Sequence, residues 1–438
     1  MQKLVARFRI VTPMFLAGVD QNKSELREPS IKGAMRFWYR AIDPLYEEKE
    51  AELFGGSGDR DGQAKFMLRI RRSGVKAERW DRNRYNLFYE RNPKHGNHIP
   101  QHATDRRATW QLNGVRYLGF SLFMRDHSAR RPLLPGKEDF TLEIFLRKNP
   151  GVEQRRCIIA SLWLLGHFGG LGTRSRRGFG TLSLQSISLE NGEDWPEVEE
   201  LPLAKDASDT KKWKETYSRV LKKLKQEWFP GQRKVDHTVF GDSTKICLLK
   251  TGQKGRSISS NQMEAWEYAL DAAGKALQGF RQRWDLEDNN SDYFRVKQHL
   301  YAANKRHLHI AGLKPKNLTR APERAAFGLP LAFRYSSLEH VRTGRNGRRF
   351  TKRPNILFDG SGKGRDRSAS RIFVRVVQIG EAVYPMFVRM DGLLLKSGDS
   401  IKTNEVNGRT FHPPSDDILN KFWAGLPKKE EIEWSSLS

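Results

Sequence analysis

Cysteine is scarce in this chain of 438 residues, which carries only Cys157 and Cys247. Each lies in an apolar run, so the sequence excludes a disulfide framework and favours a reducing compartment. The N-terminal stretch lacks the long apolar core of a signal peptide. The longest apolar segment, around 158–165, is far too short to cross a bilayer. These absences predict a soluble, cytoplasmic protein without membrane contacts.

Acidic residues are also few, because 51 Asp and Glu stand against 78 Lys and Arg and leave a net charge of +27. Such an excess favours a polyanionic partner, RNA or DNA, and excludes little about the fold. The chain shows no paired carboxylates for a metal-dependent nuclease and no Gly-Gly-Asp-Asp signature. We therefore expect no metal and no cofactor. The length exceeds one ordinary hydrophobic core and predicts two domains.

One stretch, 169–180, reads GGLGTRSRRGFG and lies between a helix-like apolar run and a strand-like run. Glycine is needed where the backbone takes a positive φ or lies close to another surface, and successive amides can bind an anion. Arginine adds planar donors that match phosphate oxygens. The spacing excludes a Walker loop and a Rossmann turn. A helix C-cap followed by a tight basic turn remains an alternative to a phosphate site.

A predicted helix that starts at Ser30 carries the second basic cluster. Ile31, Met35, Trp38 and Ile42 form one apolar stripe on it. Lys32, Arg36 and Arg40 form another stripe with a spacing of four residues. Like charges at that spacing repel, so they require a compensating anion or full solvation. We favour a phosphate as that anion.

The pattern G-x-G-x5-G-x-G from Gly170 to Gly180 resembles the glycine-rich loop of the RAMP superfamily of CRISPR-associated proteins. The stretches 12–18 (TPMFLAG) and 25–38 (ELREPSIKGAMRFW) are similar to the opening of one RAMP family, the first-numbered subunit of the Cmr (type III-B) effector complex. Together the motifs cover about the first 190 residues. The segments 324–334 and 366–376 match more loosely.

The resemblance implies an α+β fold with two ferredoxin-like (RRM-like) RAMP domains that carry inserted loops and helices. The order of predicted elements in the first half approaches β-α-β-β-α-β, with an additional hairpin around 115–123. An acidic, proline-containing stretch is the candidate linker. The predicted division is a first RAMP domain at 1–190, a linker at 191–210 and a second domain with a helical insertion at 211–438.

The resemblance also implies a function. A subunit of this kind is a non-catalytic RNA-binding protein of an antiviral ribonucleoprotein, with CRISPR RNA, target RNA and other RAMP subunits as partners. It contacts the CRISPR RNA near its 3′ end and helps to capture the target RNA. In that family the basic helix lies beside the glycine loop. The predicted RNA contacts are Lys32, Arg36, Arg40, Gly170, Gly172, Arg174, Ser175, Arg176, Arg177, Gly178, Arg365, Arg367 and Arg371.

Histidine residues suggest alternatives to a non-catalytic RNA-binding function. In a metal-independent RAMP endoribonuclease that processes CRISPR RNA, His167 would act as general base, although a structural histidine suits its apolar surroundings better. The spacing of His95, His98 and His102 allows a zinc site without an evident fourth ligand, or a solvated loop. A DNA-binding protein unrelated to CRISPR is a further alternative that the composition permits.

Overall fold

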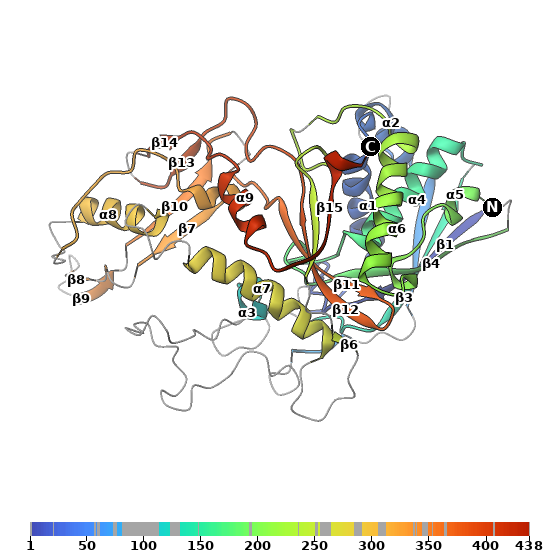
Figure 1. Ribbon diagram of the computed structural model, residues 1–438, viewed down its shortest axis with the longest axis horizontal. Coiled ribbons are helices and arrows are strands. Elements are labelled where there is room, and N and C mark those ends of the chain that lie inside the picture. The colour runs from blue at the N-terminus through green and yellow to red at the C-terminus, as the bar shows by residue number, and fades with distance from the viewer. Residues whose placement is uncertain are drawn as a thin grey trace. The chain divides into compact units, whose positions relative to one another are not determined.

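A computed structural model of the protein (Figure 1) forms two compact units. Unit 1 comprises residues 1–276, 372–391 and 427–438, and unit 2 comprises residues 277–371 and 392–426. The structure describes residues 2–20, 22–56, 58, 62–72, 77–80, 114–122, 132–147, 149–191, 195–234, 236–249, 253–254, 264–283, 291–304, 312–335, 338, 340–343, 349–352, 354–362, 366–405 and 408–437.

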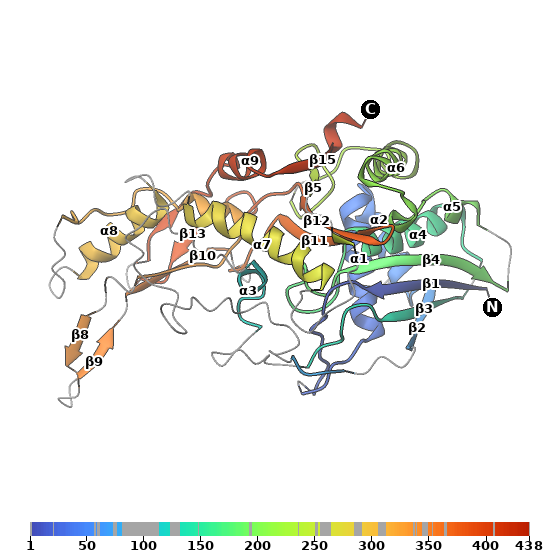
Figure 2. The same cartoon turned by 60° about the horizontal axis from the view of Figure 1, so that its bottom comes forward.

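The first sheet of unit 1 is antiparallel and has the strand order β2-β3-β1-β4. Its strands are β1 (Lys3–Ile10), β2 (Phe66–Arg72), β3 (Asp139–Leu146) and β4 (Leu182–Glu190). Helices α1 (Glu28–Ile42) and α4 (Val152–His167) lie side by side on one face of it (Figure 2). Alternate apolar residues of β1 point to these helices and are fully buried, as the period of two requires. The predicted β-α-β-β-α-β order is therefore present here.

The second sheet of unit 1 has the order β11-β12-β5-β15 and is also antiparallel. Its main strands are β5 (Lys245–Leu249), β11 (Ile372–Ile379), β12 (Ala382–Arg389) and β15 (Lys428–Glu433), and the short β6 (Gln253–Lys254) pairs with the first residues of β12. Counted along the chain, both sheets place their strands in the order second, third, first, fourth. Strands β11 and β12 form an antiparallel hairpin, in which Ile372 pairs with Arg389 and Ile379 with Ala382.

Residues 195–228 pack onto the core of unit 1. They form α5 (Pro196–Glu199), the 3-10 turn η2 (Ala204–Asp206), α6 (Thr210–Lys223) and the π-helical turn η3 (Leu224–Trp228). Trp195 and Leu201 are buried among the core residues, so the described part of the predicted linker is not an exposed connection. The two compact units thus differ from the predicted division at 190 and 211, because residues 211–276 belong with the first sheet.

Unit 2 has its own apolar core, centred on residues such as Leu331, Phe333 and Phe358. Its main sheet has the order β14-β13-β10-β7. The elements are α8 (Asp292–Asn304), η4 (Glu323–Phe327), β7 (Leu331–Arg334), the hairpin β8 (His340–Thr343) and β9 (Arg349–Lys352), β10 (Asn355–Gly360), β13 (Ile401–Thr403), β14 (Thr410–Phe411) and α9 (Asp417–Ala424). In sequence, α7 (Ala265–Arg283) runs across the boundary between the units.

Three further short elements belong to unit 1: α2 (Tyr46–Phe54), α3 (Gly114–Leu118) and η6 (Trp434–Ser436). The hairpin predicted around 115–123 is wrong, since its first part is the helix α3. The amide of Gly114 donates to the carboxylate of Asp271 at 2.8 Å, which anchors this helix to α7. None of the helices in the described ranges has the length and apolar character that a membrane crossing requires.

Candidate nucleic-acid interface

The glycine loop, Gly169–Gly180, connects the end of α4 to the start of β4. The amide of Gly169 donates to the carbonyls of Leu164 and Leu165, so it closes the last turn of the helix. The amide of Leu171 donates to the carbonyl of Gly180 at 2.9 Å. Both ends of the loop are therefore held together by backbone hydrogen bonds.

Positive φ angles explain why glycine is required within the loop. Gly172 has a φ of +84° and Gly180 a φ of +62°. A Cβ on Gly180 would lie 2.0 Å from the carbonyl oxygen of Leu171, and one on Gly172 would lie 2.5 Å from that of Phe15. A side chain at either position would be strained and would also collide with backbone. The glycines thus fix the path of the loop.

Two segments beside the loop hold it in place with hydrogen bonds. The hydroxyl of Thr12 donates to the carbonyl of Gly178 at 2.6 Å and accepts from the amide of Thr181 at 3.0 Å. On the other side, the amide of Val374 in β11 donates to the carbonyl of Arg176 at 3.0 Å. The loop therefore joins the two sheets of unit 1.

Several loop amides are already used inside the protein. The amide of Thr173 donates to the carbonyl of Phe15 at 2.8 Å, and the amide of Arg177 donates to the carbonyl of Arg174 at 2.8 Å. The amide of Gly180 likewise donates to the carbonyl of Pro13. At these positions the backbone cannot also form the anion site that the sequence suggested, so side chains carry more of any phosphate binding.

The arginines of the loop rest on aromatic and hydroxyl groups. The guanidinium of Arg176 lies 5.2 Å from the ring centre of Phe37 and 4.7 Å from that of Phe373. Burial lowers the pKa of Arg176 to about 10, so it remains charged at neutral pH. Arg174 donates to the hydroxyl of Ser121 at 2.8 Å. Stacking and hydrogen bonding hold these planar groups in place while their charge persists.

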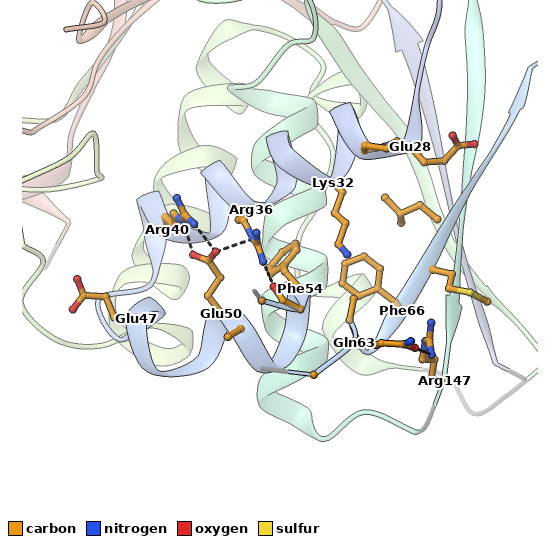
Figure 3. A pocket seen from close by; sticks show the side chains of 18 residues that line it. Glu28, Lys32, Arg36, Arg40, Glu47, Glu50, Phe54, Gln63, Phe66 and Arg147 are labelled. Atoms are coloured by element: carbon orange, nitrogen blue, oxygen red, sulfur yellow. Dashed lines mark hydrogen bonds and ion pairs between the residues drawn. The ribbon is translucent and has the colours of Figure 1, made fainter. Parts of the chain in front are cut away.

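The basic stripe of α1 lines a separate pocket of about 1220 Å³ between α1, α2 and β2 (Figure 3). Its wall also carries Glu50 from α2 and the rings of Phe54 and Phe66. The complete lining is Glu28, Pro29, Lys32, Arg36, Arg40, Glu47, Glu50, Ala51, Phe54, Gly55, Gly56, Gly62, Gln63, Ala64, Phe66, Met67, Leu68 and Arg147. None of the loop residues 169–180 is among them.

Glu50 supplies a compensating anion for the like charges of the basic stripe. Its carboxylate is almost fully buried, lies 2.7 Å from Nε of Arg36 and accepts from Nη2 of Arg40 at 2.6 Å. Arg36 also donates to the carbonyl of Gly55. The prediction of a phosphate in this role was therefore incomplete, because an internal carboxylate already pairs with two of the three cations (Figure 3).

Lys32 stands apart from this ion pair. Its ammonium lies 5.7 Å from the ring centre of Phe66, and no carboxylate within the described residues forms an ion pair with it. Burial lowers the pKa of Lys32, and the charges of Arg36 and Arg147 lower it further. An anion that enters the pocket would therefore meet Lys32 and Arg147, which no carboxylate of the described residues pairs.

His167, the candidate general base, is enclosed in the core. Its Nδ1 hydrogen-bonds the carbonyl of Trp163 at 2.6 Å, and its Nε2 accepts from the amide of Ala204 at 3.1 Å. Burial lowers the pKa of His167 to about 3, so the ring is neutral. Both nitrogens are engaged and the side chain is buried, which corrects its assignment as a base that reaches an RNA hydroxyl.

The C-terminal residues that were predicted to contact RNA differ in their surroundings. Arg371 is buried and donates to the carboxylate of Asp416 and to the carbonyl of Gly392, so its role as an RNA contact is corrected to an internal ion pair. Arg367 is exposed. Arg365 and the histidines His95, His98 and His102 lie outside the described residues. Within the described ranges, no group of three His, Cys, Asp or Glu side chains is arranged to hold a metal ion.

Sequence reasoning missed Arg375 on β11. Its guanidinium is fully buried, donates to the carbonyl of Leu182 at 3.1 Å and has a pKa lowered to about 9 by burial. Nη1 lies 2.9 Å from where a Cβ on Gly170 would be, so the glycine leaves room for it. The available signal was an arginine within an otherwise apolar strand, 372–379.

Parts of this chain are similar to known proteins. Residues 7–183 match the model of the RAMP superfamily. The chain is 25% identical over 201 residues to CRISPR system Cmr subunit Cmr1-2 of Pyrococcus furiosus, an alignment that spans 43% of this chain and 97% of the relative. It is 25% identical over 221 residues to subunit Cmr1-1 of the same organism, spanning 48% of this chain and 54% of the relative.

The fold agrees with this family. A crystal structure of Cmr1 from Pyrococcus furiosus in the apo form superposes with a TM-score of 0.53 at 15% sequence identity, covering 100% of this chain and 99% of the other. That likeness concerns the fold alone. Residues 7–183 of the chain are thus similar to the RAMP superfamily, and the chain is similar to Cmr1 subunits.

Proposed function

We propose that this protein is an RNA-binding subunit of a type III-B (Cmr) CRISPR effector complex and does not itself cleave RNA. It contacts the CRISPR RNA near its 3′ end, helps to capture the target RNA, and has other RAMP subunits as partners. The names of the curated relatives, which are Cmr subunits, support membership of such a complex. The net charge of +27 supports a nucleic-acid partner.

The fold assigned to this function is a pair of ferredoxin-like domains. The first is built on β1 to β4. The second is built on β5, β11, β12 and β15, with unit 2 inserted in the connections between its strands. The equal strand order of the two sheets supports this assignment.

The arrangement of the loop arginines carries the proposal. Arg176 lies over the rings of two neighbouring phenylalanines and Arg174 donates to a hydroxyl, so charged forks are ordered before any RNA arrives. Ordered donors lose less entropy when they bind phosphate. We assign the principal backbone contacts to Lys32, Arg174, Arg176 and Arg177 and lesser ones to Arg36, Arg40 and Arg367. Gly170, Gly172, Ser175 and Gly178 shape the loop that presents them.

RNA binding across a salt series tests this function. We expect purified protein to bind single-stranded RNA with an affinity that falls steeply with salt, because each neutralised phosphate contributes about 0.7 to the slope of log K against log salt. Arg174→Ala, Arg176→Ala and Arg177→Ala together should lower that slope by about 2. Equal slopes for both proteins would exclude the loop as the phosphate site.

The same samples test the absence of catalysis. RNA incubated with the protein, with and without EDTA, should remain intact on a denaturing gel. Defined cleavage products that persist in a His167→Ala variant would indicate a different catalytic group. Products that vanish in that variant would restore the endoribonuclease alternative.

A further inference from the structure

A second pocket, of about 530 Å³, lies entirely within unit 2. Helix α8, the segment 315–317 and the connection between β13 and β14 form its walls. The lining is His299, Ala302, Ala303, Pro315, Lys316, Asn317, Glu405 and Arg409. None of these residues belongs to the proposed RNA contacts, so the proposed function does not account for this pocket.

A buried His–Glu pair anchors the pocket. His299 is only 3% exposed, and its Nε2 lies 2.9 and 3.0 Å from the two oxygens of Glu405. The hydroxyl of Thr403 donates to the same carboxylate at 3.2 Å. The hydrogen bond from His299 is the main cause that lowers the pKa of Glu405, so this carboxylate is ionised at neutral pH. The carboxylate is therefore occupied by donors of the protein itself.

Two cations and an amide from different segments converge on this pocket. Arg409 donates from Nη1 to the carbonyl of Leu318 at 3.3 Å, and its amide donates to the hydroxyl of Thr403 at 3.1 Å. Its guanidinium carries further N–H donors, and its charge also acts on the nearby carboxylate of Glu405. Lys316 and Asn317 add an ammonium and an amide group. Neither Lys316 nor Arg409 forms an ion pair with a carboxylate of the described residues.

The chemistry of this set matches a phosphate. A dianion is balanced by one ammonium and one guanidinium, and the planar fork pairs with two phosphate oxygens. Glu405 keeps its negative charge and offsets part of the positive charge, but hydrogen bonds from His299 and Thr403 hold its carboxylate in place, so it is not free to move toward a ligand. Apolar groups of Ala302, Ala303 and Pro315 leave space beside the cations, and the volume is within the range of small-molecule sites.

We propose that the unit-2 pocket binds a phosphate group, with Lys316 and Arg409 as its charged contacts and His299 as the residue that holds the carboxylate of Glu405 in place by a hydrogen bond. The phosphate can belong to a free small molecule or to the end of an RNA. In this arrangement His299 is a positioning residue, because it acts through Glu405.

Calorimetric titration of the full chain with inorganic phosphate tests the site, at constant ionic strength maintained with chloride. The loop variant with Arg174→Ala, Arg176→Ala and Arg177→Ala provides the background, so that phosphate bound at the glycine loop is removed from the signal. Lys316→Ala and Arg409→Gln should each weaken phosphate binding at least tenfold. Lys314→Ala, an exposed lysine two positions from Lys316 that does not line the pocket, is the matched control and should bind as the background does.

His299 distinguishes an electrostatic role from a merely structural one. His299→Asn should weaken phosphate binding, and adding Glu405→Gln should restore it, because the second change removes the repelling charge. Melting temperatures measured for each variant identify any that fail to fold. Equal phosphate affinity in Lys316→Ala, Arg409→Gln and Lys314→Ala, or the absence of saturable binding in the background protein, would overturn the proposal.

Further ligands identify the source of the phosphate. Adenosine 5′-monophosphate that binds more tightly than inorganic phosphate, with no binding of adenosine, would identify a small nucleotide ligand. A short RNA that loses affinity only when its terminal phosphate is removed would identify an RNA end. Succinate that binds as tightly as phosphate would show a general dianion site and contradict the assignment to phosphate. Because these titrations use the loop variant, failure of the proposed RNA function would leave their outcome unchanged.

Discussion

The glycine loop and the basic stripe of α1 carry the same number of predicted cations but hold them differently. Arg36 and Arg40 share the buried carboxylate of Glu50, which compensates much of their charge. In the loop, Arg176 lies over the rings of Phe37 and Phe373, which position its guanidinium without neutralising its charge. A basic motif in a sequence therefore does not indicate how much positive charge a ligand will meet, because the supporting groups decide that.

The largest expected effect is the difference in RNA affinity between variants of the glycine loop and variants of the α1 stripe. Arg174→Ala, Arg176→Ala and Arg177→Ala together should weaken RNA binding by on the order of 100-fold, because three charged contacts are lost. Arg36→Gln with Arg40→Gln should weaken it by less than about 5-fold, since Glu50 already uses much of their charge. Filter binding at one salt concentration measures both. A larger loss in the α1 double variant would reverse the comparison.

Replacing a glycine by alanine should change the unfolding free energy in opposite directions in the glycine loop and in α1. Gly180→Ala forces a side chain into a positive φ and against the carbonyl of Leu171, so we expect a loss of at least about 2 kcal/mol in unfolding free energy. Gly33 lies in α1 with open space around it, and Gly33→Ala should stabilise by about 0.5 kcal/mol through helix propensity. Denaturant unfolding measures the pair. Equal shifts would mean that the loop is not held as described.

The pH dependence of stability tests whether a neutral His167 side chain supports the end of α4, where the glycine loop begins. The pKa of His167 is lowered to about 3 in the fold and is ordinarily about 6.5, so stability is complete above pH 6.5 and is lost as the pH falls toward 3. Between pH 7 and pH 5 the loss should reach about 2 kcal/mol. His167→Gln should remove this part of the pH dependence, whatever its effect at pH 7. An unchanged slope in that variant would contradict a buried neutral ring.

The smallest effect concerns Glu50 itself. Glu50→Gln leaves Arg36 and Arg40 with uncompensated charge, so RNA affinity should rise by about 3-fold even where the fold becomes somewhat less stable. Glu47→Gln is the matched control, because Glu47 lies on the same helix and pocket wall but pairs with Lys234 at 2.8 Å. Should both variants bind RNA equally, Glu50 would not limit the charge of the stripe.

Local periodicity predicted much of the fold. The apolar stripe of α1 is buried as expected, since Ile31, Met35, Trp38 and Ile42 all lie in the core. Such patterns depend on neighbours within a few turns, and the sequence displays them directly. The helix begins two residues before the predicted Ser30, a difference typical of helix ends.

Long-range pairing could not be predicted in the same way. Nothing in the run 372–390 indicates that it joins β5 in the first unit, since strand pairing depends on tertiary packing. The need for an anion beside the stripe was evident, but several glutamates occur between 47 and 52 and only the fold selects Glu50. The segment 191–210 suggested a linker because it is acidic and contains Pro196 and Pro202, while the burial of Trp195 and Leu201 is decided by tertiary packing.

The two sheets of unit 1 also differ in how they can assemble during synthesis. Every strand of the first sheet has left the ribosome soon after residue 190. The central strand of the second, β5, must wait for β12 at 382–389 and β15 at 428–433. Until then its backbone groups lack their partners, and such distant pairings form slowly. A nascent chain of about 400 residues would therefore carry one finished sheet and one with an open edge, a stage at which a chaperone or a neighbouring subunit can act.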